Sequence, residues 1–182
     1  MNYAEIKNCD IANGPGVRVS LFVSGCTHHC PGCFNQVAWD FDYGKPFTQE
    51  TIDRILAMLQ PGYIKGLTLL GGEPFEPENQ PAVVELLRQI KAKYPEKSIW
   101  AFSGYLFDRD ILAGRLGPWE ITREYLSYLD VLVDGPFVES RKNLSLRFRG
   151  SENQRIIDVP ASLAGNRIVL WQDWQGEGRG MK

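Results

Sequence analysis

The chain has 182 residues, of which 43% are hydrophobic and 23% charged, as in an ordinary globular protein. Its formal net charge of −2 at pH 7 gives no support to nucleic-acid binding through bulk charge. No apolar run approaches the roughly 20 residues that span a bilayer, and residues 1–16 hold no apolar signal core. We therefore expect a cytoplasmic protein that binds neither nucleic acid nor membrane.

Predicted strands alternate with predicted helices along most of the chain. The apolar run at 17–23 indicates a strand, and a cysteine-rich loop follows it directly. The segment 48–62 is typical of a helix, with Thr48 as its N-cap and Pro61-Gly62 at its end. The later predicted elements are a strand at 66–70, a helix at 79–94, a strand at 98–102, helices at 106–112 and 120–128, a strand at 130–135, and weaker strands at 154–160 and 166–172.

Each clear strand is mostly apolar and helices separate the strands, so the pattern favours an α/β fold whose parallel sheet is covered by helices. A full eight-unit barrel takes about 250 residues, which is more than this chain has. We therefore expect a partial, open TIM-like barrel of about five or six parallel strands with outer helices.

Three of the four cysteines lie close together in the segment GCTHHCPGCFN, at 25–35. In a reducing cytosol, clustered cysteines indicate metal binding or catalysis more often than disulfides. Their spacing is C-x3-C-x2-C, and a structural zinc site would need a fourth ligand. His28 or His29 could supply one, but both lie inside the tight loop, where the geometry is poor. Cys9 lies apart, and we interpret it as a plain small residue, with a fourth ligand as the alternative.

An iron–sulfur cube suits Cys26, Cys30 and Cys33 better than zinc does, since thiolates hold the irons of such clusters. Three protein ligands leave one iron open to a small molecule, so the missing ligand itself indicates chemistry on a bound molecule. Zinc and unrelated thiols remain as alternatives. We expect His28 and His29 to be exposed loop residues, with a hydrogen bond to a cluster sulfur as the alternative.

The cysteine loop belongs to a set of five segments, which are DIANGPGVRVSLFVSGCTHHCPGCFN, LLGGEPF, WAFSGY, LVDGPF and RFRGSENQR. In this order they resemble the radical S-adenosylmethionine (SAM) enzymes, and more narrowly the family of anaerobic ribonucleoside-triphosphate reductase-activating proteins. The resemblance implies a radical SAM activase domain at 1–158. It leaves a C-terminal extension at 159–182, which we expect to be partly strand with a Gly-rich end.

The family resemblance implies a reaction that agrees with an open iron. One electron from a [4Fe-4S] cluster would cleave bound SAM into methionine and a 5′-deoxyadenosyl radical. This radical would take a hydrogen atom from a glycine Cα in the large subunit of anaerobic ribonucleotide reductase, leaving a glycyl radical there. A flavodoxin-like reductant would supply the electron, and the protein would position the reactants and exclude water.

The resemblance also assigns roles to residues. Cys26, Cys30 and Cys33 would ligate the cluster and form its catalytic core. The segment Gly71-Gly72-Glu73 would receive the methionine amino group, since glycine permits close backbone approach, unless it is only a turn. The segment Gly32-Cys33-Phe34 would contact SAM near its adenine, unless Phe34 is an ordinary core residue.

Two polar residues follow strand ends. Ser103 would hydrogen-bond the ribose or the methionine carboxylate, with a helix cap as the alternative. Asp134 would also bind SAM, with turn formation before Gly135 as the alternative. The NGPG segment at 13–16 is typical of a turn, and the resemblance implies that it lines the glycine loop of the partner.

The run at 141–155 contains five basic residues and one acidic residue. Arg147 and Arg149 straddle Phe148, so a strand would place both guanidinium groups on one face. Docking to the reductase and a salt bridge to the SAM carboxylate both remain open as their role.

Three other functions also remain open from the sequence. The protein could activate another glycyl-radical enzyme of the pyruvate formate-lyase type. It could act on a small molecule, like the radical SAM enzymes of the deazaguanine-forming type. It could also be a non-catalytic iron–sulfur electron carrier, which would ligate its cluster fully and would have no use for the GGEP segment.

Overall fold

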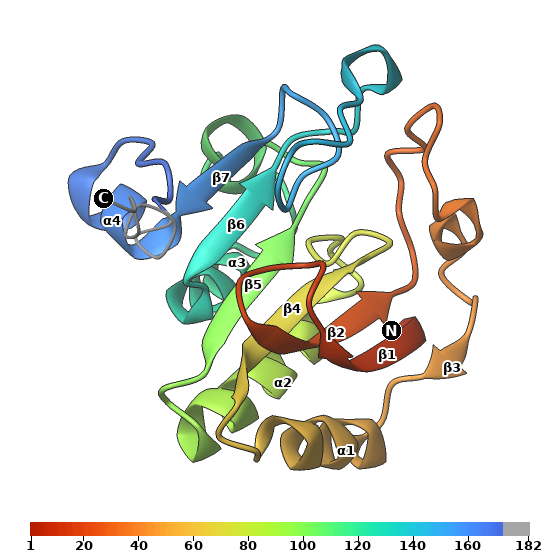
Figure 1. Cartoon of the computed structure of the whole chain (residues 1–182), viewed down its shortest axis with the longest axis vertical. Helices are drawn as coiled ribbons and strands as arrows, with labels where there is room; N and C mark the ends of the chain where they lie inside the picture. The colour runs from red at the N-terminus through yellow and green to blue at the C-terminus, as the bar shows by residue number, and fades with distance from the viewer. Residues whose placement is uncertain (173–182) are drawn as a thin grey trace, which may run out of the picture.

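Seven strands form one sheet in the computed structural model, which describes residues 1–172 (Figure 1). Their order across the sheet is β3-β1-β2-β4-β5-β6-β7. The strands are β1 (Asn2–Asp10), β2 (Val17–Val23), β3 (Lys45–Pro46), β4 (Ile64–Gly71), β5 (Ser98–Phe102), β6 (Val131–Asp134) and β7 (Arg155–Asp158). The helices are α1 (Gln49–Leu59), α2 (Gln80–Lys93), α3 (Trp119–Tyr128) and α4 (Val159–Gly165), with short turns of helix η1 (Gln36–Trp39), η2 (Phe107–Ile111) and η3 (Glu139–Arg141).

The four central strands, β2, β4, β5 and β6, run parallel. The chain returns between them through α1, α2 and α3, as parallel pairing demands. Figure 1 shows α2 and α3 behind the sheet and α1 at its lower end. The remaining strands are antiparallel to their neighbours. Residues 11–16 connect β1 to β2, and this segment is too short for a crossover, so the pair is antiparallel.

The predicted α/β class is confirmed. The expected five or six parallel strands are wrong for the described residues, in which only four strands run parallel. A TIM-like barrel is not confirmed, since the sheet is open with β3 and β7 at its edges. Strand β1 was not predicted. A shift of register between Tyr3 and Glu5 interrupts the alternation that marks a strand in sequence.

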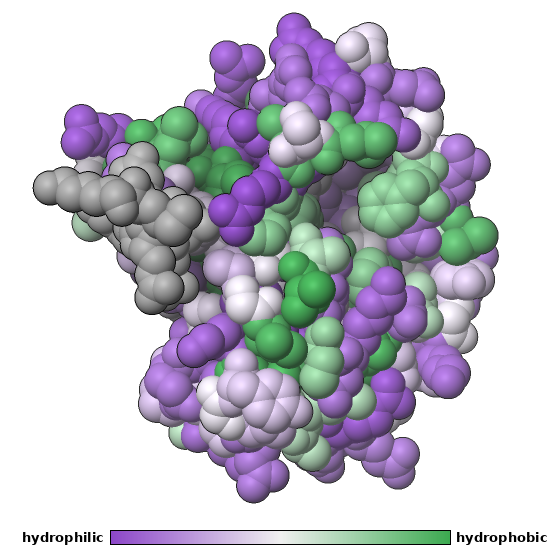
Figure 2. Space-filling view, viewed as in Figure 1, coloured by the Kyte–Doolittle hydropathy of each residue, from purple (hydrophilic) through white to green (hydrophobic). Residues whose placement is uncertain are grey.

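Alternate side chains of the central strands face opposite sides of the sheet. One side packs against the helices and forms the main core, to which the strands contribute fully buried aliphatic residues: Val19, Leu21, Leu67, Leu69, Ile99 and Leu132. The other side, here called the open face, carries a smaller cluster around Trp100, Val131 and Val133. Figure 2 views the molecule from this side: apolar side chains gather near its middle, and the surface is hollowed beside the loops at the top.

Arg18 is buried on the open face, with 1% of its surface exposed. Its Nε donates to Thr68 Oγ1 at 2.8 Å, its Nη1 to Ser98 Oγ at 3.0 Å, and its Nη2 to the carbonyls of Leu67 and Ser98 at 2.8 and 2.9 Å. The guanidinium carbon lies 5.6 Å from the ring centroid of Trp100. Burial lowers the pKa of this guanidinium to about 10, so it stays charged at neutral pH. Arg18 therefore ties together the amino-terminal ends of three parallel strands.

The predicted helices are present, and Thr48 is the N-cap of α1, its backbone N–H donating to Thr51 Oγ1 at 3.3 Å. Asn79 occupies the N-cap position of α2, but its side chain binds the loops of the site described below. None of the helices within residues 1–172 is long and apolar enough to cross a membrane.

The chain after β7 departs from expectation. Helix α4 was not predicted, and the strand expected at 166–172 is reduced to one bridge, between Leu170 and Ile157. The Asp158 N–H donates to Val169 O, and the Trp171 N–H donates to Ile156 O, both at 2.9 Å. This segment thus covers the outer edge of β7. The predicted Gly-rich end, at 176–182, lies outside the described residues.

Substitution of Trp171 tests whether the segment that covers the edge of β7 stabilises the fold. Its ring centroid lies 5.0 Å from that of Trp100, on the open face. Replacing Trp171 with alanine is expected to cost about 1–2 kcal/mol of unfolding free energy, because edge-to-face packing and apolar burial are lost. Thermal unfolding followed by circular dichroism should show a melting temperature lower by about 2–8 °C. Leu170→Ala, at an exposed position of the same segment, is the control. Equal melting temperatures of the two variants would contradict a stabilising contact between Trp171 and Trp100.

Candidate active site

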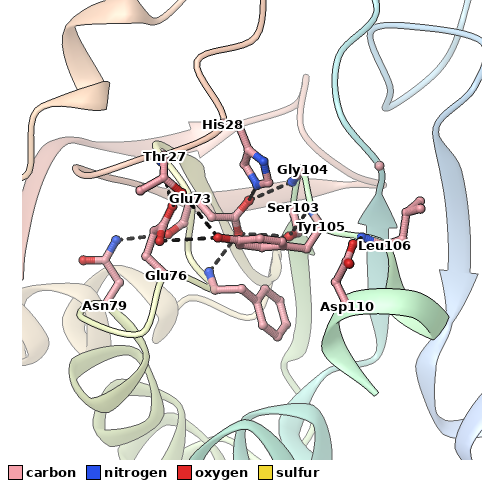
Figure 3. A network of polar contacts seen from close by, with 12 residues as sticks. Thr27, His28, Glu73, Glu76, Asn79, Ser103, Gly104, Tyr105, Leu106 and Asp110 are labelled. Atoms are coloured by element: carbon pink, nitrogen blue, oxygen red, sulfur yellow. Dashed lines mark hydrogen bonds and ion pairs between the residues drawn. The ribbon is translucent and has the colours of Figure 1, made fainter. Parts of the chain in front are cut away.

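Loops from four strands meet at one edge of the sheet. The cysteine loop follows β2, Gly71 ends β4, Ser103 follows β5, and Asp134 ends β6. Since these four strands are parallel, their carboxyl ends lie on the same side. The structure therefore places the three cysteines at the same edge of the sheet as Gly71, Ser103 and Asp134. Figure 3 shows part of the contacts between the loops.

The cysteine loop is held at its base by backbone hydrogen bonds. The Gly25 N–H donates to Ala38 O at 2.9 Å and the Cys26 N–H donates to Trp39 O at 3.1 Å, so η1 closes the loop. Gly25 has φ +93°, and a Cβ there would lie 2.2 Å from the ring of Phe41. A glycine is therefore required at the point where the chain leaves β2 and turns into the loop.

All three loop cysteines are partly buried. Backbone N–H groups of His28 and His29 approach the Cys26 sulfur, and that of Phe137 approaches the Cys30 sulfur. Burial raises the pKa of the Cys26 thiol to about 12, and the charge of the neighbouring carboxylates adds to the rise. Burial likewise raises the pKa of Cys30. These sulfurs are therefore thiols unless a cation lies beside them, which would favour the thiolate form.

Cys9 lies at the opposite end of the sheet. It belongs to β1 next to Asp10, which pairs with Arg18 at the start of β2, whereas Cys26 follows the end of that strand. The seven residues of β2 span about 20 Å. The alternative that Cys9 is a fourth ligand of the same site is therefore wrong, and its exposed position agrees with a role outside it.

Gly71 and Gly72 allow the loop after β4 to pack directly on the cysteine loop. Gly71 has φ +110°, and a Cβ there would lie 2.7 Å from the Phe22 Cα. A Cβ on Gly72 would lie 2.5 Å from the Gly25 carbonyl oxygen. The Glu73 N–H donates to that same oxygen at 2.8 Å. Close contact between two backbones thus accounts for both glycines, and a ligand approaching the same segment stays a prediction.

Glu73 is almost completely buried, with 1% of its surface exposed, and four donors surround its carboxylate. Oε1 accepts from the Phe75 N–H at 2.8 Å and from Ser103 Oγ at 2.9 Å. Oε2 accepts from the Gly104 N–H at 2.7 Å and from His28 Nε2 at 3.0 Å. The predicted residues Glu73 and Ser103 are thus brought into direct contact with each other.

Asp134 is fully buried and forms an ion pair with Arg155. Arg155 Nε donates to Asp134 Oδ1 at 2.9 Å, and the Phe107 N–H donates to Oδ2 at 2.8 Å. The second partner of Arg155 is Asp108, whose pKa is lowered by this hydrogen bond. The structure therefore gives the Asp134 side chain protein partners, and its contact with SAM stays a prediction.

Arg155→Met should destabilise the protein by about 3 kcal/mol, because the buried Asp134 carboxylate would lose its counter-charge. Adding Asp134→Asn should recover part of this loss, since the amide needs no counter-charge. Urea unfolding of the two single variants and the double variant measures the coupling between the residues. An Arg155→Met protein as stable as the wild type would contradict this account.

Phe34 has 89% of its surface exposed, so the alternative that it is a core residue is wrong. Gly32, two residues before it, has φ +73°, and a Cβ there would lie 2.7 Å from the Glu139 carboxyl carbon. The cysteine loop therefore lies against η3 on one side, and it presents an aromatic ring to solvent.

The expected strand through Arg147 and Arg149 is wrong. Phe148 between them has φ +57°, so the chain turns at this point. Arg149 Nη1 donates to Gln154 O at 2.6 Å, and the Arg147 guanidinium lies 5.0 Å from the ring centroid of Phe148. The two guanidinium groups therefore have different partners within this segment.

Comparison with known proteins places the chain in a family. A family model described as "4Fe-4S single cluster domain" matches residues 12–157, which include every residue of the site. The anaerobic ribonucleoside-triphosphate reductase-activating protein of phage T4 is 43% identical over 158 residues, which cover 86% of this chain and 93% of that protein. The proteins of the same name from Vibrio cholerae and Escherichia coli K12 are 43% and 42% identical, over 86% and 85% of this chain and 97% and 96% of their own.

The chain belongs to the family of anaerobic ribonucleoside-triphosphate reductase-activating proteins. The resemblance that the sequence motifs predicted is confirmed. The donor set fits the cluster that the family model names: three thiols lie on one loop, and backbone N–H groups already approach two of the sulfurs. Among the described residues 1–172, no three His, Cys, Asp or Glu side chains form a group that could hold a metal ion as they stand.

The expectation of an exposed histidine pair is wrong for His28. Its side chain is 18% exposed, and its ring lies 4.3 Å from that of Tyr105. Burial alone would lower the pKa of His28, but its hydrogen bond and charge interaction with Glu73 outweigh this and raise the pKa. His29 is exposed, as expected, and lies against Trp39 at 4.6 Å.

Sequence reasoning missed two further residues that connect the loops, Glu76 and Asn79. Glu76, with 2% of its surface exposed, accepts from the Thr27 N–H and from Thr27 Oγ1, both at 2.7 Å. Asn79 Nδ2 donates to the carbonyls of Ser24 and Glu73 at 2.9 and 3.0 Å. The available signal was the segment EPFEPEN, in which polar side chains repeat after a buried strand and before a helix.

Proposed function

We propose that this protein activates an anaerobic ribonucleoside-triphosphate reductase. Cys26, Cys30 and Cys33 hold three irons of a [4Fe-4S] cluster, and SAM binds at the iron that no cysteine holds. The observation that carries the proposal is the group of three thiols on one loop at the carboxyl edge of the parallel strands, in a chain whose relatives bear the reductase activator's name. Those names also favour the reductase over an enzyme of the pyruvate formate-lyase type as the partner.

The cluster, when bound, supplies the single electron that cleaves SAM into methionine and a 5′-deoxyadenosyl radical. The residues of this chain hold SAM in place and keep water away from it. That chemistry would allow a hydrogen atom to pass from a glycine Cα of the reductase's large subunit to the deoxyadenosyl carbon, so that a glycyl radical would remain on the partner. A flavodoxin-like reductant provides the electron.

SAM is bound at the edge where the four loops meet. The segments Gly71-Gly72-Glu73 and Gly32-Cys33-Phe34 border the cysteines and offer backbone groups to the ligand. Ser103 and Asp134 shape the same edge, through the hydrogen bonds that their side chains make with Glu73 and Arg155. Phe34 is exposed beside the cysteines and is the aromatic ring available to adenine.

SAM cleavage can be tested without the partner. The chain is reconstituted anaerobically with iron and sulfide, and SAM and dithionite are then added. Iron content should approach about four atoms per chain, and chromatography should detect 5′-deoxyadenosine and methionine that form only with SAM and reductant. A fully loaded cluster that releases no 5′-deoxyadenosine would instead indicate an electron carrier.

A further inference from the structure

Two buried carboxylates lie beneath the first half of the cysteine loop. Glu73 and Glu76 both belong to the segment that joins β4 to α2, and 1% and 2% of their surfaces are exposed. Their partners in the cysteine loop are consecutive residues, His28 and Thr27, which lie between Cys26 and the next cysteine. Figure 3 shows both contacts from close by.

Donors within the protein occupy the hydrogen-bond acceptor sites of the Glu73 carboxylate. Its two oxygens offer about four acceptor sites, and four donors occupy them: the N–H groups of Phe75 and Gly104, Ser103 Oγ and His28 Nε2. The donors come from three loops, those following β2, β4 and β5. One carboxylate therefore connects three loops, and little acceptor capacity remains for the amino group of a bound ligand.

His28 sits in a slot shaped for its ring. The ring lies 4.3 Å from the Tyr105 ring on one side, and a Cβ on Gly104 would lie 2.5 Å from the imidazole Cδ2 on another. The glycine thus leaves the room that the imidazole fills. Beside it, Glu76 Oε1 accepts hydrogen bonds from the backbone N–H and from the hydroxyl of Thr27, both at 2.7 Å. The cysteine loop is consequently fixed at two adjacent residues by charged acceptors.

We propose that Glu73 and Glu76 form a clamp that positions the cysteine loop, and that the Glu73 side chain acts on His28 instead of on SAM. The clamp fixes the backbone between Cys26 and Cys30, at Thr27 and His28. Glu73 and His28 are then positioning residues. The value of the clamp for catalysis rests on the proposed function, whereas the clamp itself exists in the metal-free chain.

The first test uses the metal-free full-length chain and hydrogen–deuterium exchange. His28→Asn removes the donor, because the shorter amide cannot reach Glu73, whereas His28→Gln carries an amide N–H at about the position of Nε2. Peptides covering residues 24–33 should exchange about tenfold faster in His28→Asn, since a hydrogen bond to a charged group is lost. The rates should return to near wild type in His28→Gln. His29→Asn is the matched control, since His29 is exposed and has φ +46°, which asparagine tolerates.

The second test separates positioning from ligand binding. Glu73→Gln is compared with Glu78→Gln, an exposed residue of the same segment that undergoes the same change of charge. The clamp predicts that Glu73→Gln speeds exchange of residues 24–33 about tenfold in metal-free protein, and that iron is lost faster to a chelator after reconstitution. A direct contact with SAM predicts the reverse: unchanged exchange and iron retention, with weaker SAM binding by calorimetry.

The proposal is overturned if His28→Asn exchanges like the wild type, or if His28→Gln is as perturbed as His28→Asn. Should Glu73→Gln fail to fold, the two His28 variants still decide the outcome, because that side chain is partly exposed and lies on a loop. A clamp confirmed by exchange in a chain that cleaves no SAM would leave the positioning role standing and would contradict the proposed function alone.

Discussion

Replacing Cys30 with serine is expected to abolish SAM cleavage. Cys30 is one of only three thiols on the loop, and the next cysteine in the chain, Cys9, lies about 20 Å away at the other end of β2. Loss of a residue that merely supports a metal ligand costs about 10–100-fold in affinity or activity, so loss of a ligand itself should cost more. The amount of 5′-deoxyadenosine released by reconstituted Cys30→Ser should be less than about one hundredth of the wild-type amount.

Cys9→Ser is the matched control for this experiment, because it makes the same atomic change outside the site. It should load iron and cleave SAM like the wild type. Metal-free Cys30→Ser should have the same melting temperature as the metal-free wild type. The loss of SAM cleavage would then come from the cluster and not from the fold. Full activity in Cys30→Ser, or equal loss in both variants, would contradict the assignment of the three ligands.

The second large effect is on stability. Arg18→Met should lower the unfolding free energy by about 3 kcal/mol, because the hydroxyls of Thr68 and Ser98 and two backbone carbonyls lose a buried donor together. Contact with the Trp100 ring is lost as well. Thermal unfolding of the metal-free chain should show a melting temperature about 6–12 °C lower.

Arg54→Met is the control for the arginine substitution, since Arg54 is exposed on α1. Its effect should stay within about 0.5 kcal/mol, as for most surface substitutions. If the two variants melt together, the four hydrogen bonds of Arg18 do not stabilise the sheet. If Arg18→Met melts early but still cleaves SAM when folded, the residue acts on the fold alone, as its place at the amino-terminal ends of the strands indicates.

The sequence was informative about the fold where periodicity is strong. The buried strands β2, β4, β5 and β6 and the helices between them follow from apolar runs and caps. The antiparallel edges were harder, because an edge strand is partly exposed and β1 carries a register shift between Tyr3 and Glu5. Helix α4 has only the residues Val159–Gly165, too few for a period to emerge.

Within the site, the C-x3-C-x2-C spacing points to a cluster, and the ligand role of each cysteine stays a prediction. The partners of Glu73 could not be predicted from the sequence. A carboxylate that follows a strand has the same local sequence pattern whether it faces a ligand or a histidine. The sequence predicts an exposed loop position for His28, whereas the structure places its ring between Tyr105 and Gly104. Asp134 likewise depends on Arg155, 21 residues later, and nothing in either local segment links the two.

The most direct test of the account is electron paramagnetic resonance of the reductase. The large subunit is incubated anaerobically with the reconstituted protein, SAM and reductant, and a parallel sample omits SAM. We expect a doublet from a glycyl radical on the reductase in the complete sample and no such signal without SAM. A loaded cluster that cleaves SAM yet leaves the reductase without that doublet would contradict the central claim.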